Sequence, residues 1–272
     1  MITELQTKSE ELIDAPLEVR LQHFAHSFLN ITYGQWKDGS DLESLDDFNY
    51  QLDVLDCVTY VELVLALAKT HPDGNFIDLL RRLHYMAGTP NYISRNHFFS
   101  LDWIPNNAPI ITDITPDVAF QMQVATAVID KINWLKVTKN ITDIPMHLIH
   151  QLQPQEVRTP YISTTDLLDN QSSYFHAFPE YSICCIVRPN WDLTKQIGTH
   201  LNISHLGFVF KDHVTQTLRF YHASGSSTDK NCDLPFKVVT IDLCEYMAKY
   251  LDSPTIRGLN VLGISPGYFN AG

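Results

Sequence analysis

The chain has 272 residues, and its 19 Lys and Arg against 31 Asp and Glu give a formal net charge of −12. Nucleic acid binding needs clustered Lys and Arg, and no such cluster occurs in this sequence, which argues against nucleic acid as a main partner. An aromatic content of 11% and the lack of low-complexity tracts argue against disorder. No run approaches the about 20 consecutive apolar residues of a membrane-spanning helix.

The sequence starts with Met1-Ile2-Thr3-Glu4 and lacks the basic and apolar parts of a signal peptide there. Taken literally, this start predicts a cytoplasmic protein. A signal peptide that had been removed and replaced by a new Met would leave the same start, so both compartments stay open.

The five cysteines are Cys57, Cys184, Cys185, Cys232 and Cys244. Their number is odd, and no Cys-x-x-Cys pair occurs. This pattern argues against a disulfide framework and against a cysteine zinc site. At least one thiol is therefore free of any bridge within the chain.

Apolar residues recur at helical spacing in the first third of the chain. We expect helices over Leu17–Leu29, over a segment from Cys57 to just before Pro72, and over Phe76–Met86. Asp56 is a good N-cap for the second helix, whose apolar run is interrupted by Glu62. The polar, acidic stretch Asp38–Asp53 predicts a loop.

The middle of the chain, Thr112–Ser173, has no clean periodicity, and we expect a helix there only over Pro116–Ile132. The last third is rich in short apolar and β-branched runs with turn signals between them. These runs predict strands at Tyr181–Val187, Ile203–Phe210, Thr217–Ala223, Val238–Leu243 and Asn260–Ile264.

Helices that precede strands in this way predict an α+β fold. No composition shift marks a linker, so we expect a single domain over residues 1–272. Within it we distinguish a helical part (1–110), an insertion (111–175) and a β-sheet part (176–272).

Cys57 directly follows the expected N-cap of its helix. The free N–H groups and partial positive charge of a helix start stabilise a thiolate, which lowers a thiol pKa from about 8.5 to about 3.5–7.5 in known cases. The same N–H groups could hold a developing oxyanion. This position suits a nucleophile, and the alternative interpretation is a buried apolar cysteine at a helix end.

A nucleophilic cysteine needs a base within reach, and two histidines lie on neighbouring expected strands. If the connecting hairpin is symmetric, Phe210 pairs with Thr217, and His205 stands directly opposite His222. One imidazole could then act as the base while the other orients it. A slip of one residue would put them on opposite faces, and the alternative interpretation is a pair of half-buried strand histidines.

Two further histidine pairs, His23-x-x-His26 and His147-x-x-His150, could each present two imidazoles on one helix face. Neither has a carboxylate spaced to complete a metal site, which favours surface histidines. A metal-dependent hydrolase built on these pairs is a third interpretation, and it predicts inhibition by chelators. The sequence has no Gly-rich phosphate loop, so no nucleotide cofactor is expected.

Four motifs follow one another along the chain: Asp56-Cys57-Val58-Thr59, Ser94-Arg95-Asn96-His97, Ser204-His205-Leu206-Gly207 and Tyr221-His222-Ala223-Ser224. Together they resemble the N-acetylmuramoyl-L-alanine amidase-like family, first defined as a domain of unknown function and a branch of the NlpC-type papain-like cell-wall hydrolases. The resemblance runs from about Phe28 to Ile264.

The resemblance implies an α+β, papain-like core of the NlpC type, in which a helix bearing the Cys packs on an antiparallel β-sheet, with extra helical and loop insertions. It implies that Cys57 is the nucleophile, that His205 is the base and that His222 orients His205. It needs no metal and no cofactor.

Other residues of the matching motifs are implied to bind substrate; they are Tyr33, Asp56, Arg95, Asn96 and His97. The segment Ile31-Thr32-Tyr33-Gly34 lacks a proline that the family has there. Arg95 could bind a substrate carboxylate through both arms of its guanidinium.

The implied function is that of a cysteine amidohydrolase with peptidoglycan-derived muropeptides as substrate. The implied bond joins N-acetylmuramic acid to L-Ala in small fragments. Alternatives are a γ-D-glutamyl-diamino acid endopeptidase of the cell wall and a catalytically silent muropeptide-binding module. Cell-wall substrates suggest the periplasm or cell envelope, whereas the start of the sequence, taken literally, suggests the cytoplasm.

Overall fold

The computed structural model describes residues 2–36, 48, 50–71, 73–225 and 236–269. The strands are β1 (Thr32–Tyr33), β2 (Val54–Leu55), β3 (Ile111–Asp113), β4 (Met122–Ile129), β5 (Gln155–Ser163), β6 (Tyr181–Leu193), β7 (Thr199–Asp212), β8 (Thr217–Ser224), β9 (Lys237–Asp242) and β10 (Gly258–Ile264). The helices are α1 (Ile2–Glu11), α2 (Leu17–Ser27), α3 (Cys57–Lys69), α4 (Phe76–His84), α5 (Ile104–Asn106), α6 (Thr115–Val118), α7 (Lys131–Lys139), α8 (Met146–Ile149), α9 (Thr164–Asp169), α10 (Gln171–Ala177), α11 (Thr194–Ile197) and α12 (Leu243–Ala248). Two further helical turns, η1 (Met86–Gly88) and η2 (Phe99–Trp103), lie between α4 and α5.

One ten-stranded sheet organises the molecule, with the strand order β2-β1-β9-β8-β7-β6-β10-β5-β4 and with β3 paired to β10 off this path. The short pair β1–β2 is parallel, and the other pairings are antiparallel. The sheet is therefore mostly antiparallel and, with its helices, makes an α+β fold. Among the described helices, none is both long and apolar enough to cross a membrane.

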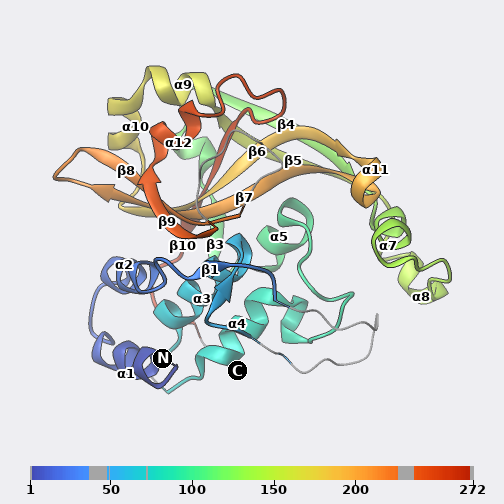
Figure 1. Ribbon diagram of the computed structural model, residues 1–272, viewed down its shortest axis with the longest axis horizontal. Helices are drawn as coiled ribbons and strands as arrows, with labels where there is room; N and C mark the ends of the chain where they lie inside the picture. Colours follow the sequence, from blue (N-terminus) through green and yellow to red (C-terminus); the bar gives the residue numbers. More distant parts are fainter. Residues whose placement is uncertain (1, 37–47, 49, 72, 226–235, 270–272) are drawn as a thin grey trace.

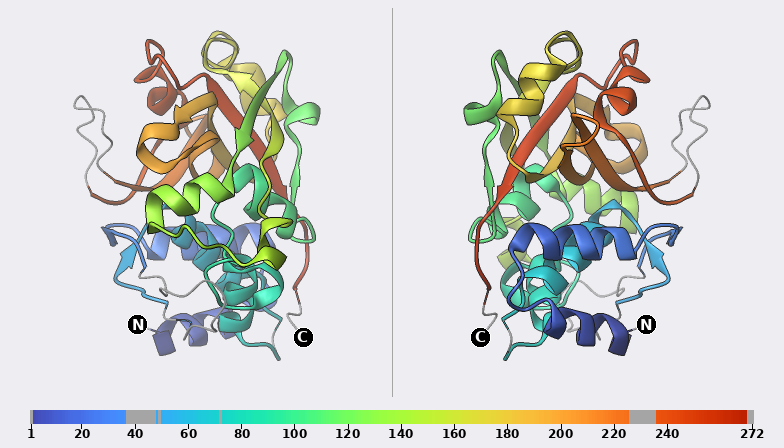
Figure 2. Two further views of the ribbon diagram at one scale, coloured as in Figure 1. Left: turned by 90° about the vertical axis from the view of Figure 1, so that its right-hand side faces the viewer. Right: turned by 90° about the vertical axis from the view of Figure 1, so that its left-hand side faces the viewer.

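Helices cover both faces of the sheet, so the fold has three layers (Figure 1). On the face of α2, α3 and α4, the core includes Leu206 and Phe208 of β7. On the face of α9, α10 and α12, it includes Val209 of the same strand. The side views in Figure 2 show the N-terminal helices on one side of the sheet and α9 and α10 on the other. Because both faces are covered, the adjacent Cys184 and Cys185 are both fully buried.

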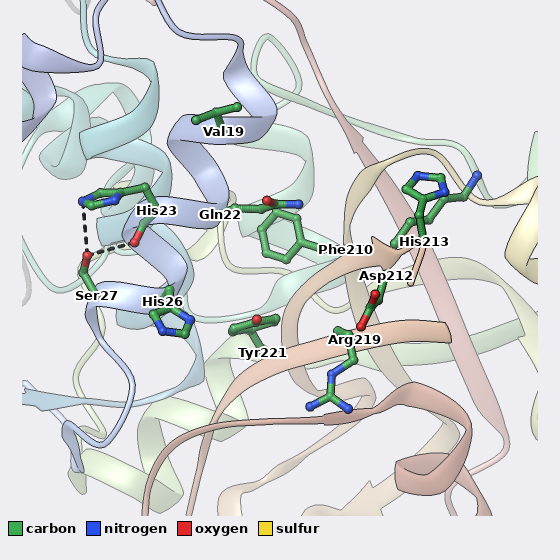
Figure 3. Close-up of a pocket in the computed structure, with 11 residues that line it drawn as sticks. Val19, Gln22, His23, His26, Ser27, Phe210, Asp212, His213, Arg219 and Tyr221 are labelled. Carbon is green, nitrogen blue, oxygen red and sulfur yellow. Dashed lines mark hydrogen bonds between the residues drawn. The ribbon is translucent and has the colours of Figure 1, made fainter. Parts of the chain in front are cut away.

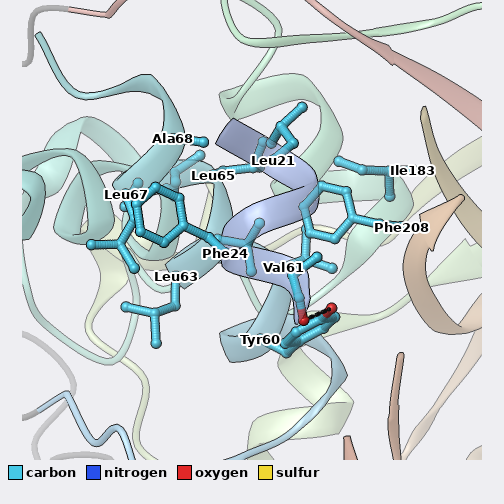
Figure 4. Close-up of a cluster of buried hydrophobic side chains, with 14 of the residues drawn as sticks. Leu21, Phe24, Tyr60, Val61, Leu63, Leu65, Leu67, Ala68, Ile183 and Phe208 are labelled. Atoms are coloured by element: carbon cyan, nitrogen blue, oxygen red, sulfur yellow. Dashed lines mark hydrogen bonds between the residues drawn. The ribbon is translucent and has the colours of Figure 1, made fainter. Parts of the chain in front are cut away.

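The helix α3 is the centre of the core beneath the sheet. Its residues from Thr59 to Lys69 are all buried, and Phe24 of α2 packs against its apolar side chains (Figure 4). Phe24 and Leu63 are fully buried, and each such side chain stabilises the fold by about 1.5–3 kcal/mol. This packing holds the start of α3, and with it Cys57, in a fixed place under the sheet.

The expected helices at Leu17–Leu29, at Cys57 and at Phe76–Met86 are confirmed as α2, α3 and α4. The five expected strands of the last third are confirmed as β6 to β10, with β6 and β7 longer than predicted. Most of the stretch predicted as a loop, Asp38–Asp53, lies outside the described residues.

The predicted helix over Pro116–Ile132 is wrong. Only α6 and the first two residues of α7 are helical there, and β4 takes up most of the remainder. In its second half β4 alternates between exposed and buried residues, which is the period of a strand. Val124 and Val128 are exposed, so apolar residues lie on both faces of the strand and hide the alternation from a reading of the sequence.

The segment 111–175 adds strands to the common sheet, because β3 and β5 both pair with β10. Helices α7 and α8 project from one end of that sheet (Figure 1). A small core of Leu135, Leu148 and Leu152 packs there against Tyr92. The projecting helices are thus anchored to the loop that carries the Ser-Arg-Asn-His motif.

Candidate active site

A tightly capped helix start carries Cys57. The Asp56 side chain accepts hydrogen bonds from the backbone N–H groups of Val58 (3.0 Å) and Thr59 (2.9 Å), and the Asp56 N–H donates to Thr59 Oγ1 (2.9 Å). These bonds form a complete capping box. The Asp56 carboxylate, which we predicted to bind substrate, is therefore engaged in holding the first turn of α3.

Burial raises the pKa of the Cys57 thiol, and the Asp56 carboxylate raises it further. The backbone N–H groups of Leu206, Cys57 and Val58 lower it by less. The expectation of a lowered thiol pKa is therefore wrong, because loss of water around the sulfur outweighs the partial charge of the helix start. The thiol is protonated at neutral pH, and its sulfur lies beside the Leu206 N–H of β7.

The structure brings His205 of β7 and His222 of β8 together. His205 Nε2 and His222 Nδ1 are 2.9 Å apart, and the two rings meet edge to face. The prediction that they stand directly opposite each other is wrong. The observed pairs are Phe210 with Arg219 and Asp212 with Thr217, which is a shift of two residues from the symmetric hairpin.

A shift of two residues keeps both histidines on one face, because side chains alternate with a period of two. The same register puts Gly207 opposite His222, so that the two imidazoles meet diagonally. A Cβ atom at Gly207 would overlap the carbonyl oxygen of Tyr221 and lie 2.8 Å from Cβ of His222. The glycine therefore leaves the space that the His222 side chain occupies.

Burial and the Arg188 cation lower the pKa of His205 to about 4. Burial and the neighbouring His205 lower the pKa of His222 well below its usual range. Both rings are therefore neutral at neutral pH. They lie against Phe220 and Tyr246, with ring centroids 4.7–6.4 Å apart.

The thiol and the imidazole pair pack against different cores. Cys57 packs against the core on the α3 side, whereas Phe220 and Tyr246, which support the imidazoles, belong to the core on the other side. The hydrogen bonds of the described residues include none between Cys57 Sγ and either imidazole, and His205 Nδ1 is the ring nitrogen not bonded to His222. The sulfur lies beside the N–H of Leu206, in the peptide that joins His205 to Leu206.

Tyr33 of β1 lies close enough to the thiol for Cys57 to affect its titration. Burial, Cys57 and Asp56 raise the pKa of the half-buried Tyr33 to about 12, so its hydroxyl keeps its proton. A Cβ atom at Gly225 would overlap the Tyr33 ring. The chain after β8 thus passes directly over the ring and fixes its place beside the site.

The predicted substrate residues of the Ser-Arg-Asn-His motif make bonds to neighbouring segments. Asn96 Nδ2 donates to the Leu83 carbonyl (2.8 Å), and His97 Nε2 lies 2.8 Å from the Tyr92 carbonyl. Burial lowers the pKa of His97 well below its usual range and that of Arg95 to about 10. These contacts brace the loop, and the structure brings none of the three side chains to the histidine pair.

Sequence reasoning missed two polar groups near the site. Glu62 of α3 is fully buried and bonds His84 and Trp103; the signal for it was a single acid within an apolar helix. Arg188 of β6 donates from Nε to Ser204 (3.1 Å), the neighbour of His205. No local pattern in the sequence predicts that Arg188 lies near the site, because its position depends on the pairing of distant strands.

A separate pocket of about 580 Å³ opens between α2 and the β7–β8 hairpin. Figure 3 shows His23 turned toward Ser27, and the Arg219 guanidinium pointing away from Gln22 and Phe210. The polar groups of this pocket therefore do not converge on one point. Among the described side chains, no group of three or more His, Cys, Asp or Glu is placed to hold a metal ion. Within that part of the chain, His23 and His26 therefore gain no third ligand of these types.

The fold and these residues define a class of α+β proteins in which a helix bearing a cysteine packs on a mostly antiparallel sheet bearing a histidine pair. The family model described as AmiA-like, N-acetylmuramoyl-L-alanine amidase-like, matches residues 23–254. The chain belongs to this family, which supports a hydrolase with a peptidoglycan amidase-like role.

Solved structures share the fold. A Legionella pneumophila protein is 28% identical, with a TM-score of 0.82, and the match covers 99% of this chain and 96% of that one. An N-acetylmuramoyl-L-alanine amidase from Bacteroides uniformis is 21% identical, with a TM-score of 0.61, and the match covers 92% of this chain and 99% of that one. No curated protein gives a significant match to the chain.

Proposed function

We propose that this protein is a cysteine amidohydrolase that cuts the amide between N-acetylmuramic acid and L-Ala in small peptidoglycan fragments. The observation that carries the proposal is the placement of Cys57, at a capped helix start, beside the peptide of a histidine that is itself held by a second histidine. An NlpC-type, papain-like assignment of the core is part of the proposal. The substrate class rests on the amidase-like family.

The pKa directions support a neutral thiol and a neutral base in the free protein rather than a preformed ion pair. In the base form, His205 carries its proton on Nε2 and donates it to His222 Nδ1, so that His205 Nδ1 is free to accept. As substrate binds, Nδ1 takes the proton from Cys57 and the sulfur attacks the amide carbonyl. His222 holds the ring in this tautomer.

The developing oxyanion needs donors that stay protonated. The backbone N–H of Cys57 and the Tyr33 hydroxyl supply them, since the raised pKa of Tyr33 keeps its proton in place. The imidazolium of His205 then protonates the leaving amine, which departs as the free peptide. Water, activated by His205, releases the acyl group from the sulfur and restores the thiol.

The test is incubation of the purified protein with a soluble anhydromuropeptide, with the products identified by mass spectrometry. Release of the intact peptide from the sugar is the expected result. A cut between D-Glu and the diamino acid would keep the mechanism and replace the substrate bond. Binding without any cleavage would overturn the enzymatic proposal in favour of a binding module.

A further inference from the structure

A buried ion pair links the helix that carries Cys57 to α4. His84 Nδ1 and Glu62 Oε2 are 2.6 Å apart, and the exposed fractions of the two side chains are 3% and 0%. The second oxygen of Glu62 accepts a hydrogen bond from Trp103 Nε1 (2.8 Å). Both carboxylate oxygens are therefore bonded, and the pair ties α3 to the end of α4 and to η2.

Such a pair is costly to bury, and replacement of buried ion pairs by apolar residues is often neutral or stabilising. Its presence, with Glu62 as the single acidic residue of a mostly apolar helix, therefore points to a role other than stability. Glu62 lies one helical turn beyond Val58 and Thr59, whose N–H groups the Asp56 carboxylate holds. The ion pair thus sits directly behind the N-cap of Cys57.

The charges around His84 are defined by three elements. Glu62 and Asp56 face it from α3 and its N-cap, and His97 faces it from the loop after η1. Burial lowers the pKa of His84, but Glu62 and the more distant Asp56 raise it more, so the net direction is upward. The rings of Trp36, Phe48 and Tyr85 enclose the imidazole.

The charge of His84 also acts on Asp56, the N-cap of α3. Burial raises its pKa, while the hydrogen bonds from Thr59 and Val58 together with the charge of His84 lower it by less, so the net direction is upward. A carboxylate accepts the two backbone hydrogen bonds of the cap more strongly than a carboxylic acid does. A cation behind the cap therefore favours the form of Asp56 that holds the first turn of α3.

We propose that Glu62 and His84 are positioning residues for Cys57: the buried pair holds a cation behind Asp56 and keeps Asp56 ionised as the cap that sets the place of Cys57. This inference rests on the proposed role of Cys57. Its test requires no substrate, because the ion pair and the cap can be observed in the free protein.

The experiment uses NMR of the full-length protein. Ring nitrogen shifts of His84 report its charge, and the amide proton shifts of Val58 and Thr59 report the titration of the carboxylate that they contact. We expect the ring of His84 in the wild type to titrate above the midpoint of about 6.5 of a free imidazole, because Glu62 favours its charged form. A midpoint below that value would overturn the inference without the need for any variant.

Two isosteric variants remove the cation by different routes. Glu62→Gln deprives His84 of the partner that keeps it charged, and His84→Gln removes the imidazole. We expect each to raise the titration midpoint of Asp56 by about half a pH unit or more. Trp103→Phe is the matched control, since it removes a hydrogen bond to Glu62 but leaves the pair, and its midpoint should stay near that of the wild type.

An unchanged or lowered midpoint in Glu62→Gln and His84→Gln would overturn the electrostatic link. A parallel upward shift of the acid limb of the hydrolysis profile is expected in the same two variants, and a limb that stays in place would show that the cap does not position Cys57. If the wild type hydrolyses no muropeptide, the NMR midpoints still test the pair, and the failure belongs to the proposed function.

Discussion

At the scale of single residues, the site depends on small side chains as much as on reactive ones. Gly207 leaves room for His222 beside His205, and Gly225 lets the chain pass over the Tyr33 ring. A methyl group at either position would collide with a residue of the proposed mechanism. The reactive groups are thus held by close packing of the backbone around them.

Gly207→Ala should reduce hydrolysis by at least about tenfold and destabilise the fold by about 1–3 kcal/mol, because the new Cβ forces β8 or His222 to move. The rate and the urea midpoint are the two measurements. Gly263→Ala is the control, since its Cβ would meet only the end of the Ile114 side chain at 3.0 Å. Equal effects of the two substitutions would contradict the role given to Gly207.

Tyr33→Phe removes only the hydroxyl that we assign to the oxyanion. We expect kcat to fall by about 10²-fold, the typical effect of losing one such donor, with little change in KM or in the melting temperature. Steady-state kinetics and a thermal melt check this. An unchanged kcat would remove Tyr33 from the mechanism.

At the scale of elements, the N-cap of α3 has two effects, one on the stability of the helix and one on the pKa of Cys57. The Asp56 carboxylate caps the helix but also raises the pKa of Cys57. Asn is as good an N-cap as Asp and carries no charge. The two effects of this residue can therefore be measured apart.

Asp56→Asn should keep the stability of the fold within about 1 kcal/mol and should speed the alkylation of Cys57 at pH 7–8, because a lower thiol pKa gives more thiolate. Asp56→Ala should cost about 0.5–2 kcal/mol in unfolding free energy through loss of the cap. Alkylation rates and urea unfolding give both values. Slower alkylation of Asp56→Asn would contradict the sign of the charge effect.

The β7–β8 hairpin shows which features of the site the local sequence can predict. The period of two puts His205 and His222 on one face in either register, so their encounter was predictable. The register itself was not, because the turn closes at Asp212, whose side chain accepts the N–H groups of Val214 and Thr215. The assumption of a symmetric loop therefore does not predict the residue at which the turn closes.

The strands of the middle segment were not predictable for a different reason. β5 contains Pro160, which resembles a chain break, and it pairs with β10, about a hundred residues further along the chain. Such pairing is decided by the tertiary structure rather than by local propensity. The same holds for the thiol of Cys57, since its burial under β7 reverses the pKa shift that the helix start alone predicts.

At the scale of the whole molecule, several histidines are held neutral by burial. The pKa of His205 falls to about 4, and those of His97 and His222 lie well below their usual range. In the unfolded chain each would titrate near about 6.5. Below that pH the unfolded state binds more protons than the folded state, so acid favours unfolding.

The unfolding free energy should therefore fall as the pH drops from 7 to 5, by at most about 1.4 kcal/mol per pH unit for each neutral histidine. His84 acts in the opposite sense, because its raised pKa favours the folded state at low pH. It is one histidine against four, because burial also lowers the pKa of His23. Urea unfolding at a series of pH values measures the slope. A flat or rising stability toward pH 5 would contradict the burial of these rings.

The proposed mechanism depends on Cys57 as the nucleophile of an amidase. The most direct test compares release of peptide from a soluble anhydromuropeptide by the wild type, Cys57→Ala and the control Cys244→Ala, whose thiol lies on α12. We expect a loss of at least about 10³-fold in Cys57→Ala, with Cys244→Ala close to the wild type. Peptide release by Cys57→Ala at the wild-type rate would contradict this mechanism.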